Sequence, residues 1–146
     1  MIRPFDSLML RTTLAPLVAA VQLVAVYLLL HGHYSPGGGF VAGVLFAASF
    51  ILPRLTFGQP QGWLALTPQR AALMAVAGII IFAGIGVAPM FVGETMLDYA
   101  VLPLAEKAEY RRSLGILLIE VGVTMAVAGA MLSIFYALSG PVGGEK

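Results

Sequence analysis

Glu120 is the one charged side chain inside a long apolar stretch that runs from Ser113 to Leu138. A charged carboxylate inside a membrane costs about 2.5–3.5 kcal/mol on insertion scales, so such a group is neutralised, paired or placed on a water-filled path. Seven residues separate Glu120 from Ser113, which places the carboxylate up to about 10 Å below that end of a helix. Glu120 is therefore a candidate for relaying protons or binding a cation.

A second interpretation of Glu120 is also open. The segment from Val121 to Leu138 is charge-free, and as a helix it would be about 27 Å long, close to the hydrocarbon thickness of a bilayer. Glu120 would then stand at the membrane surface as an anchor.

Two histidines, His31 and His33, flank Gly32 at the end of another apolar stretch. Imidazole titrates near neutral pH and could pass protons at the mouth of a channel. Residues two apart in a helix point about 200° away from each other, so we do not expect this pair to share a metal or a haem. The alternative role of His33 is a capping or interfacial hydrogen bond.

The histidines open a polar, turn-forming interruption in a run from Thr12 to Pro53 that has no Asp, Glu, Lys or Arg. Pro36, which follows Ser35, stops the first helix and sets a turn. Gly37, Gly38 and Gly39 leave backbone N–H groups open at the start of the next helix, where the helix dipole favours negative charge and a partner can approach closely. The simpler interpretation is a glycine-rich hairpin turn.

The elements that must position these residues are membrane helices. Of 146 residues, 60 % are apolar and 10 % are charged, and the net charge is +1. So much apolar surface cannot be hidden in a soluble domain of this size, and the charge gives no basic field for nucleic acid. The absence of cysteine excludes disulfides, iron–sulfur clusters and thiolate metal sites. We expect an all-α integral membrane protein, one domain over 1–146, with four transmembrane helices at about 12–30, 37–55, 71–92 and 113–138.

Small residues form stripes on two of these helices. Gly39, Gly43 and Ala47 lie four residues apart, and Gly122 is the middle member of a second series that repeats every seven residues, with Gly115 and Gly129. Such stripes let helix backbones approach closely. We expect them to provide more packing surface than four helices need among themselves, and so to contact other subunits. Gln22, in the first helix, either bonds to a neighbouring helix or is simply tolerated there.

The distribution of Lys and Arg favours cytoplasmic termini. Five of these residues lie on the side of the termini and three lie on the other side, which is a modest excess under the positive-inside rule.

The segment GHYSPGGGFVAG, residues 32–43, closely resembles the G-H-x-x-P-G-G-G-F-x-x-G signature of the MnhB-type subunits of Mrp multisubunit cation/proton antiporters. In this motif Gly32, His33, Pro36, Phe40 and Gly43 accompany the three central glycines. The likeness extends from about residue 8 to residue 137. The family's fourth helix carries a G-[ST]-x-L-L-F-D-I-G-V-like run, and LGILLIEVGV here has Glu120 at the Asp position, with one methylene more.

This resemblance implies a small membrane subunit of an Na⁺(Li⁺,K⁺)/H⁺ antiporter complex in a bacterial or archaeal inner (plasma) membrane. Such a complex supports proton-motive-force-driven cation efflux and pH homeostasis, and its large complex I-like subunits hold the main proton path. The resemblance implies a transporter subunit and not an enzyme, with no cofactor and no metal. Its partners would be the other subunits, the bilayer, H⁺, and Na⁺ or another monovalent cation. The ion-pathway candidates are Glu120 and His33; the other motif residues and Gly122 are helix-packing candidates.

Two alternatives come from other classes of protein. The chain could be an accessory membrane subunit of an energy-converting hydrogenase or a related complex I-like redox complex. It could also be a homo-oligomeric channel with rings of Glu120. The chain shows no inverted repeat and no pair of intramembrane charges, which favours a subunit over a self-sufficient carrier.

Overall fold

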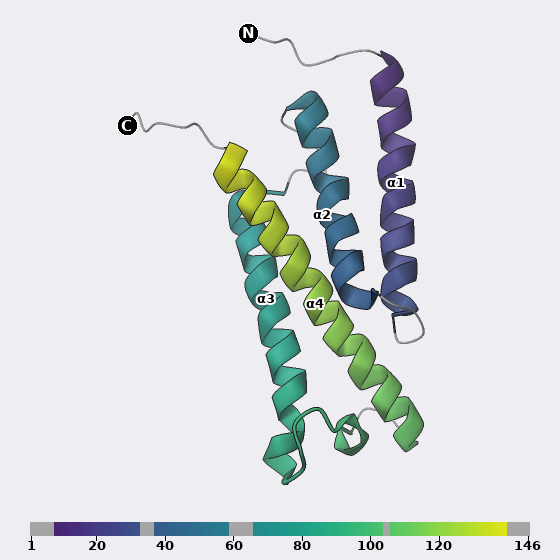
Figure 1. Ribbon diagram of the computed structural model, residues 1–146, viewed down its shortest axis with the longest axis vertical. Helices are drawn as coiled ribbons and strands as arrows, with labels where there is room; N and C mark the ends of the chain where they lie inside the picture. The colour runs from purple at the N-terminus through teal and green to yellow at the C-terminus, as the bar shows by residue number, and fades with distance from the viewer. Residues whose placement is uncertain (1–7, 33–36, 59–65, 104–105, 140–146) are drawn as a thin grey trace, which may run out of the picture.

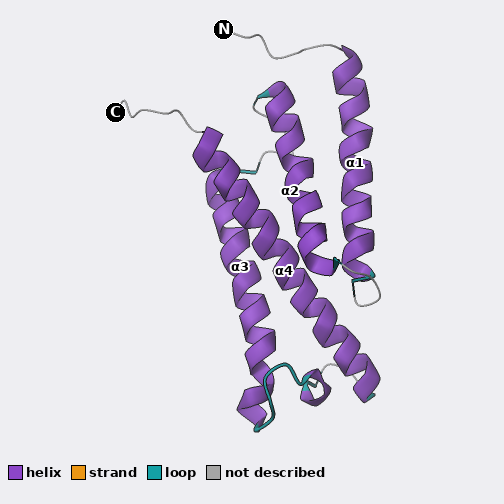
Figure 2. Cartoon of the chain, viewed as in Figure 1, coloured by secondary structure: helices purple, strands orange, loops and turns teal. Residues whose placement is uncertain are grey.

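Four long helices make up the structure, a computed structural model that describes residues 8–32, 37–58, 66–103 and 106–139. The helices are α1 (Leu8–Leu30), α2 (Gly38–Phe57), α3 (Pro68–Val87) and α4 (Ala108–Ser139) (Figure 1). Two short 3₁₀ helices, η2 (Ala88–Val92) and η3 (Tyr99–Val101), lie between α3 and α4. The described residues contain helices and loops only (Figure 2).

Each long helix is apolar enough to cross a membrane. The candidate spans are Thr12–Leu30, Gly38–Phe57, Pro68–Val92 and Glu109–Ser139. The prediction of an all-α protein with four membrane-spanning helices is therefore confirmed. That the whole chain is a single membrane domain stays a prediction.

All four long helices extend beyond a predicted end; α1 begins at Leu8, four residues before the predicted start at about 12. α2 continues past Pro53 to Phe57, and the N–H of Gly58 closes its last turn on the carbonyl of Arg54. α4 begins at Ala108, five residues before the predicted start at Ser113. Hydropathy marks only the part of a helix that suits lipid, and a helix can continue into a charged segment because its backbone bonds are internal. α3 begins at Pro68, three residues before the predicted start at about 71: Thr67 accepts a hydrogen bond from the N–H of Arg70, and Pro68 is the first helical residue.

α4 is the central helix, packed against α3 on one side and α2 on the other, and α1 packs mainly on α2 (Figure 1). Small side chains make the core: Ala47 of α2, Ala71 of α3, and Ala128 and Leu132 of α4 are buried together. The chain order α1 to α4 therefore differs from the order in space, which is α1, α2, α4, α3.

The glycine stripes are used inside this chain. A Cβ placed on Gly78 of α3 would lie 2.6 Å from the carbonyl oxygen of Gly122, and one on Gly129 would lie 2.7 Å from that of Ala71. On the other side of α4, a Cβ on Gly43 would lie 2.8 Å from the carbonyl oxygen of Thr124. The expectation that the stripes are surplus surface for other subunits is wrong for Gly43 and Gly129, because α2, α3 and α4 need these glycines to approach one another.

Gln22 of α1 bonds across to α2. Its Nε2 donates to Oγ of Ser49 at 3.2 Å, and the Ser49 hydroxyl donates to the carbonyl of Phe46 at 2.7 Å. Of the two roles open for Gln22, the structure selects the interhelical hydrogen bond.

A polar cluster joins three segments at the end of the bundle where α2 ends. Nη1 of Arg54 donates to the carbonyl of Leu66 at 3.1 Å and to the hydroxyl of Tyr136 at 2.9 Å. The Tyr136 hydroxyl donates to the same Leu66 carbonyl at 2.6 Å, and the Arg54 guanidinium lies 4.4 Å from the centre of the Tyr136 ring. The end of α2, the residues just before α3, and the end of α4 are therefore held at one point.

We expect Tyr136→Phe to destabilise the detergent-extracted protein by about 1 kcal/mol, because it removes two hydrogen bonds and keeps the aromatic ring. Thermal unfolding followed by loss of the monodisperse chromatographic peak measures the effect. Tyr110→Phe is the matched control, since Tyr110 lies on the same helix and its side chain is exposed. Equal unfolding midpoints for the two variants would contradict a stabilising role of the cluster.

Candidate functional site

The Glu120 side chain lies directly on the backbone of the glycine motif. A Cβ placed on Gly32 would overlap both carboxylate oxygens and lie 2.5 Å from Cδ of Glu120. A Cβ on Gly38 would lie 3.0 Å from Oε1, and one on Gly39 would lie 3.0 Å from the Glu120 carbonyl carbon. Any side chain at these positions would displace the carboxylate or push α2 away from α4.

The chain enters α2 through a conformation that favours glycine. Gly37 has φ +121° and Gly38 has φ +33°, both in the region that residues with a Cβ rarely adopt. This turn brings the first residue of α2 against Glu120 of α4. Glycine is therefore required here both for backbone geometry and for close approach.

The site places a carboxylate beside the start of a helix. The first N–H groups of α2 have no partner within the helix, and the helix dipole puts a partial positive charge at this end. The sequence indicates that Gly37 to Gly39 would attract a negative group, and the structure shows Glu120 of the same chain there. Oε2 of Glu120 is buried, although the residue as a whole is only partly covered.

Thr124 belongs to this site and is not among the residues singled out from the sequence. Its hydroxyl lies 2.9 Å from the carbonyl oxygen of Gly39 and 2.8 Å from that of Glu120, so one O–H is shared between α2 and α4. The side chain is buried. The available signal was its spacing: Thr124 follows Glu120 by four residues and so lies on the same face of α4.

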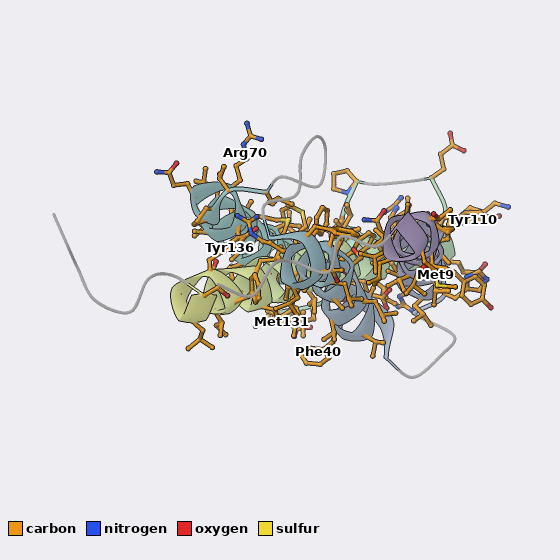
Figure 3. The ribbon with its side chains drawn as sticks, turned by 90° about the horizontal axis from the view of Figure 1, so that it is seen from above. Met9, Phe40, Arg70, Tyr110, Met131 and Tyr136 are labelled. Carbon is orange, nitrogen blue, oxygen red and sulfur yellow. The ribbon has the colours of Figure 1, made fainter. Side chains whose placement is uncertain are left out.

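The remaining candidates lie in different places. His33 and Pro36 lie outside the described residues. His31, described but not part of the motif, stacks its ring on Tyr27 at 4.3 Å between centroids. Phe40 is 61 % exposed and lies at the outer edge of the bundle (Figure 3), so any packing role of Phe40 is toward lipid or another subunit.

Gly43 of α2 and Gly122 of α4 allow two different helix contacts. Gly43 follows Gly39 along α2 and packs on Val127 and Thr124. Gly122 lies on the opposite face of α4 from Glu120, where a Cβ would lie 2.8 Å from the backbone nitrogen of Phe82 in α3. Gly43 therefore supports the α2–α4 contact at the site, and Gly122 supports the α3–α4 contact behind it.

Among the described residues, the titratable group of this arrangement is the Glu120 carboxylate. In the described part of the chain, no group of three or more His, Cys, Asp or Glu side chains gathers to hold a metal ion. A single carboxylate beside the start of a helix can accept and release a proton or contribute oxygen ligands to a monovalent cation.

Comparison with known proteins identifies the family of the chain. Residues 9–133 match the family described as "Domain related to MnhB subunit of Na+/H+ antiporter". A protein of Staphylococcus saprophyticus named "Putative antiporter subunit mnhB2" is 30 % identical over 139 residues, covering 92 % of this chain and 96 % of the relative. Proteins of the same name from Staphylococcus haemolyticus and Staphylococcus aureus (strain Newman) are 32 % and 27 % identical over the same length and shares. The chain belongs to the MnhB family, the proteins related to the MnhB subunit of Na⁺/H⁺ antiporters.

Proposed function

We propose that this chain is a membrane subunit of an antiporter complex that exchanges Na⁺ or another monovalent cation for H⁺, and that Glu120 is the residue through which it takes part in ion movement. The family supports the first part, since its named members are antiporter subunits. The second part rests on the position of the Glu120 carboxylate.

The observation that carries the role of Glu120 is the direction of its side chain. A glutamate that serves only as a surface anchor extends its carboxylate toward the headgroups and water. The Glu120 carboxylate instead lies against the backbone of Gly32 and Gly38, with Oε2 buried. A carboxylate held inward on side-chain-free backbone is suited to exchanging a proton or cation at a defined place, and this favours the relay over the anchor.

The other features of the proposed complex are proposed by resemblance to the family. The partners are further membrane subunits, among them the large ones that hold the main proton path. The membrane is the inner membrane of a bacterium or an archaeon, and the chain acts as a transporter subunit without a cofactor. His33, in the motif, is proposed as a second ion-pathway residue. The comparisons give no support to the alternative of a hydrogenase subunit.

Affinity purification of the tagged chain in mild detergent tests this proposal. We expect several different membrane proteins, including large antiporter-type subunits, to elute with it in one large assembly. A small assembly made only of this chain would instead indicate the homo-oligomeric channel, and hydrogenase or oxidoreductase subunits in the eluate would indicate the redox complex. Deletion of the gene for this chain should also abolish cation-dependent proton transport in everted vesicles.

A further inference from the structure

At the end of the bundle where Glu120 lies, the α1–α2 pair stops short of α3 and α4. α1 ends and α2 begins well above the lower ends of α3 and α4 in Figure 1. The contacts of Gly32 and Gly38 with Glu120 place this end of the α1–α2 pair at the level of Glu120. Of the residues that the structure describes, those of α3, α4 and the connection between them continue below that level.

The continuing part of α4 is apolar. From Glu120 back to Ser113 the helix has no other charged residue, and this distance is about 10 Å. Arg112 and Arg111 follow immediately. The charge-free part of α4 therefore extends about 10 Å beyond the end of the α1–α2 pair.

α3 also has a charge-free part that extends beyond the level of Glu120. The backbone of Phe82 lies opposite Gly122 of α4. Glu120 precedes Gly122 by two residues, so it is level with a residue about two positions after Phe82 in α3. From there α3 and η2 stay charge-free to Val92, a length of about 12 Å, and Glu94 is the first charge. Phe91 is 87 % exposed and Val92 is 68 % exposed, as expected for side chains that face lipid. On both helices the charge-free segment thus continues for about 10 Å beyond the level of Glu120.

On the opposite side of Glu120 the bundle is closed. Next along the α2–α4 contact, Gly43 packs on Val127. Ala47 and Leu132 come after them, and both are fully buried. In the described segments, neither α2 nor α4 has another charged side chain between Glu120 and Arg54, near the far end of the bundle. Thr124 and Ser49, polar side chains in that direction, are buried and hydrogen-bonded to the protein, and the residues around them are close-packed and apolar.

We propose that Glu120 exchanges protons and hydrated monovalent cations with one side of the membrane only, the side of the α3–α4 connection, residues 88–107. Water enters where the α1–α2 pair stops short and reaches the carboxylate beneath the membrane surface. This inference rests on the proposed role of Glu120 and adds the side of the membrane from which protons and cations reach its carboxylate. With the termini in the cytoplasm, that side is external, and passage to the other side must go through a neighbouring subunit.

The absence of cysteine makes a direct test possible, because each substitution creates the only thiol in the chain. Ile116→Cys places a thiol one turn from Glu120 toward the α3–α4 connection, and Ser49→Cys places one in the closed part. Glu94→Cys and Arg70→Cys report the two membrane surfaces, and Ile80→Cys, on an exposed apolar face of α3, reports lipid. A membrane-impermeant sulfonated maleimide is applied to right-side-out and everted vesicles that contain the assembled complex.

We expect Ile116→Cys to react from the same side as Glu94→Cys and at least 10-fold faster than Ile80→Cys, and Ser49→Cys to react from neither side. Ser113→Cys, on the same face of α4, replaces Ile116→Cys if that variant does not assemble. Labelling of Ile116→Cys from the side of Arg70→Cys, or at the rate of Ile80→Cys, would overturn the proposal. Reaction of Ser49→Cys would also overturn it by revealing a path through the bundle.

Labelling reports access and not transport, so the two proposals fail separately. The one-sided pattern combined with unchanged transport in Glu120→Gln would reject the proposed function and keep the inference about access.

Discussion

Glu120→Gln should lower cation-dependent proton transport in everted vesicles by about tenfold, with the complex still assembled. Glutamine keeps the shape of the side chain and its hydrogen-bonding capacity but cannot take up or release a proton. A side chain positioned for proton transfer raises the rate of a reaction by about 10²- to 10⁴-fold. We expect a smaller effect here because the main proton path belongs to other subunits. Glu120→Asp should retain most activity, since it keeps the charge and is one methylene shorter.

The accompanying variants separate three roles of Glu120. A purely structural contact predicts that Gln is tolerated and that Ala reduces assembly and transport together. An anchor at the membrane surface predicts that Gln, Ala and Asp all leave transport unchanged. Glu109→Gln is the matched control, because this exposed glutamate lies in the first turn of the same helix. Loss of transport in that control would point to a general effect of charge on α4.

Gly78→Leu and Gly39→Leu should each remove most of the folded subunit from the membrane. At both positions even a single Cβ overlaps backbone atoms of α4, and an added side chain must separate the helices. Overpacking of a close contact costs about 1–3 kcal/mol, and a leucine against backbone lies at the upper end or above it. Because the contact is within the chain, we expect loss of the subunit itself and not only of its complex. Membrane abundance and the monodisperse peak after extraction measure this.

Gly84→Leu supplies the control on α3. Nothing lies within 4 Å of a Cβ placed on Gly84, so the leucine has room within this chain. Its membrane abundance should equal that of the unchanged protein. Normal abundance of Gly78→Leu would show that α3 and α4 do not meet at this stripe.

The number and the place of the membrane helices follow from the sequence by itself. Transfer into lipid depends on the composition of a continuous segment, so charge-free lengths such as Thr12 to Leu30 identify their own helices. The start of α3 is equally local, because Thr67 and Pro68 act on the turn that directly follows them. Glu120 was also identifiable, since a charge in an apolar helix is conspicuous without any knowledge of its neighbours.

The surroundings of Glu120 were decided by the tertiary structure. These helices are apolar on all sides, so the sequence pattern does not show which face of α4 meets α2 and which meets α3. Their rotation and register depend on the fit between backbones, as at Gly39 with Glu120 and at Gly78 with Gly122. For the same reason the shared hydroxyl of Thr124 was not predicted. Hydrophobicity acts along the chain and places each helix in the membrane, whereas close packing acts between distant segments and brings the Glu120 carboxylate onto the glycine motif.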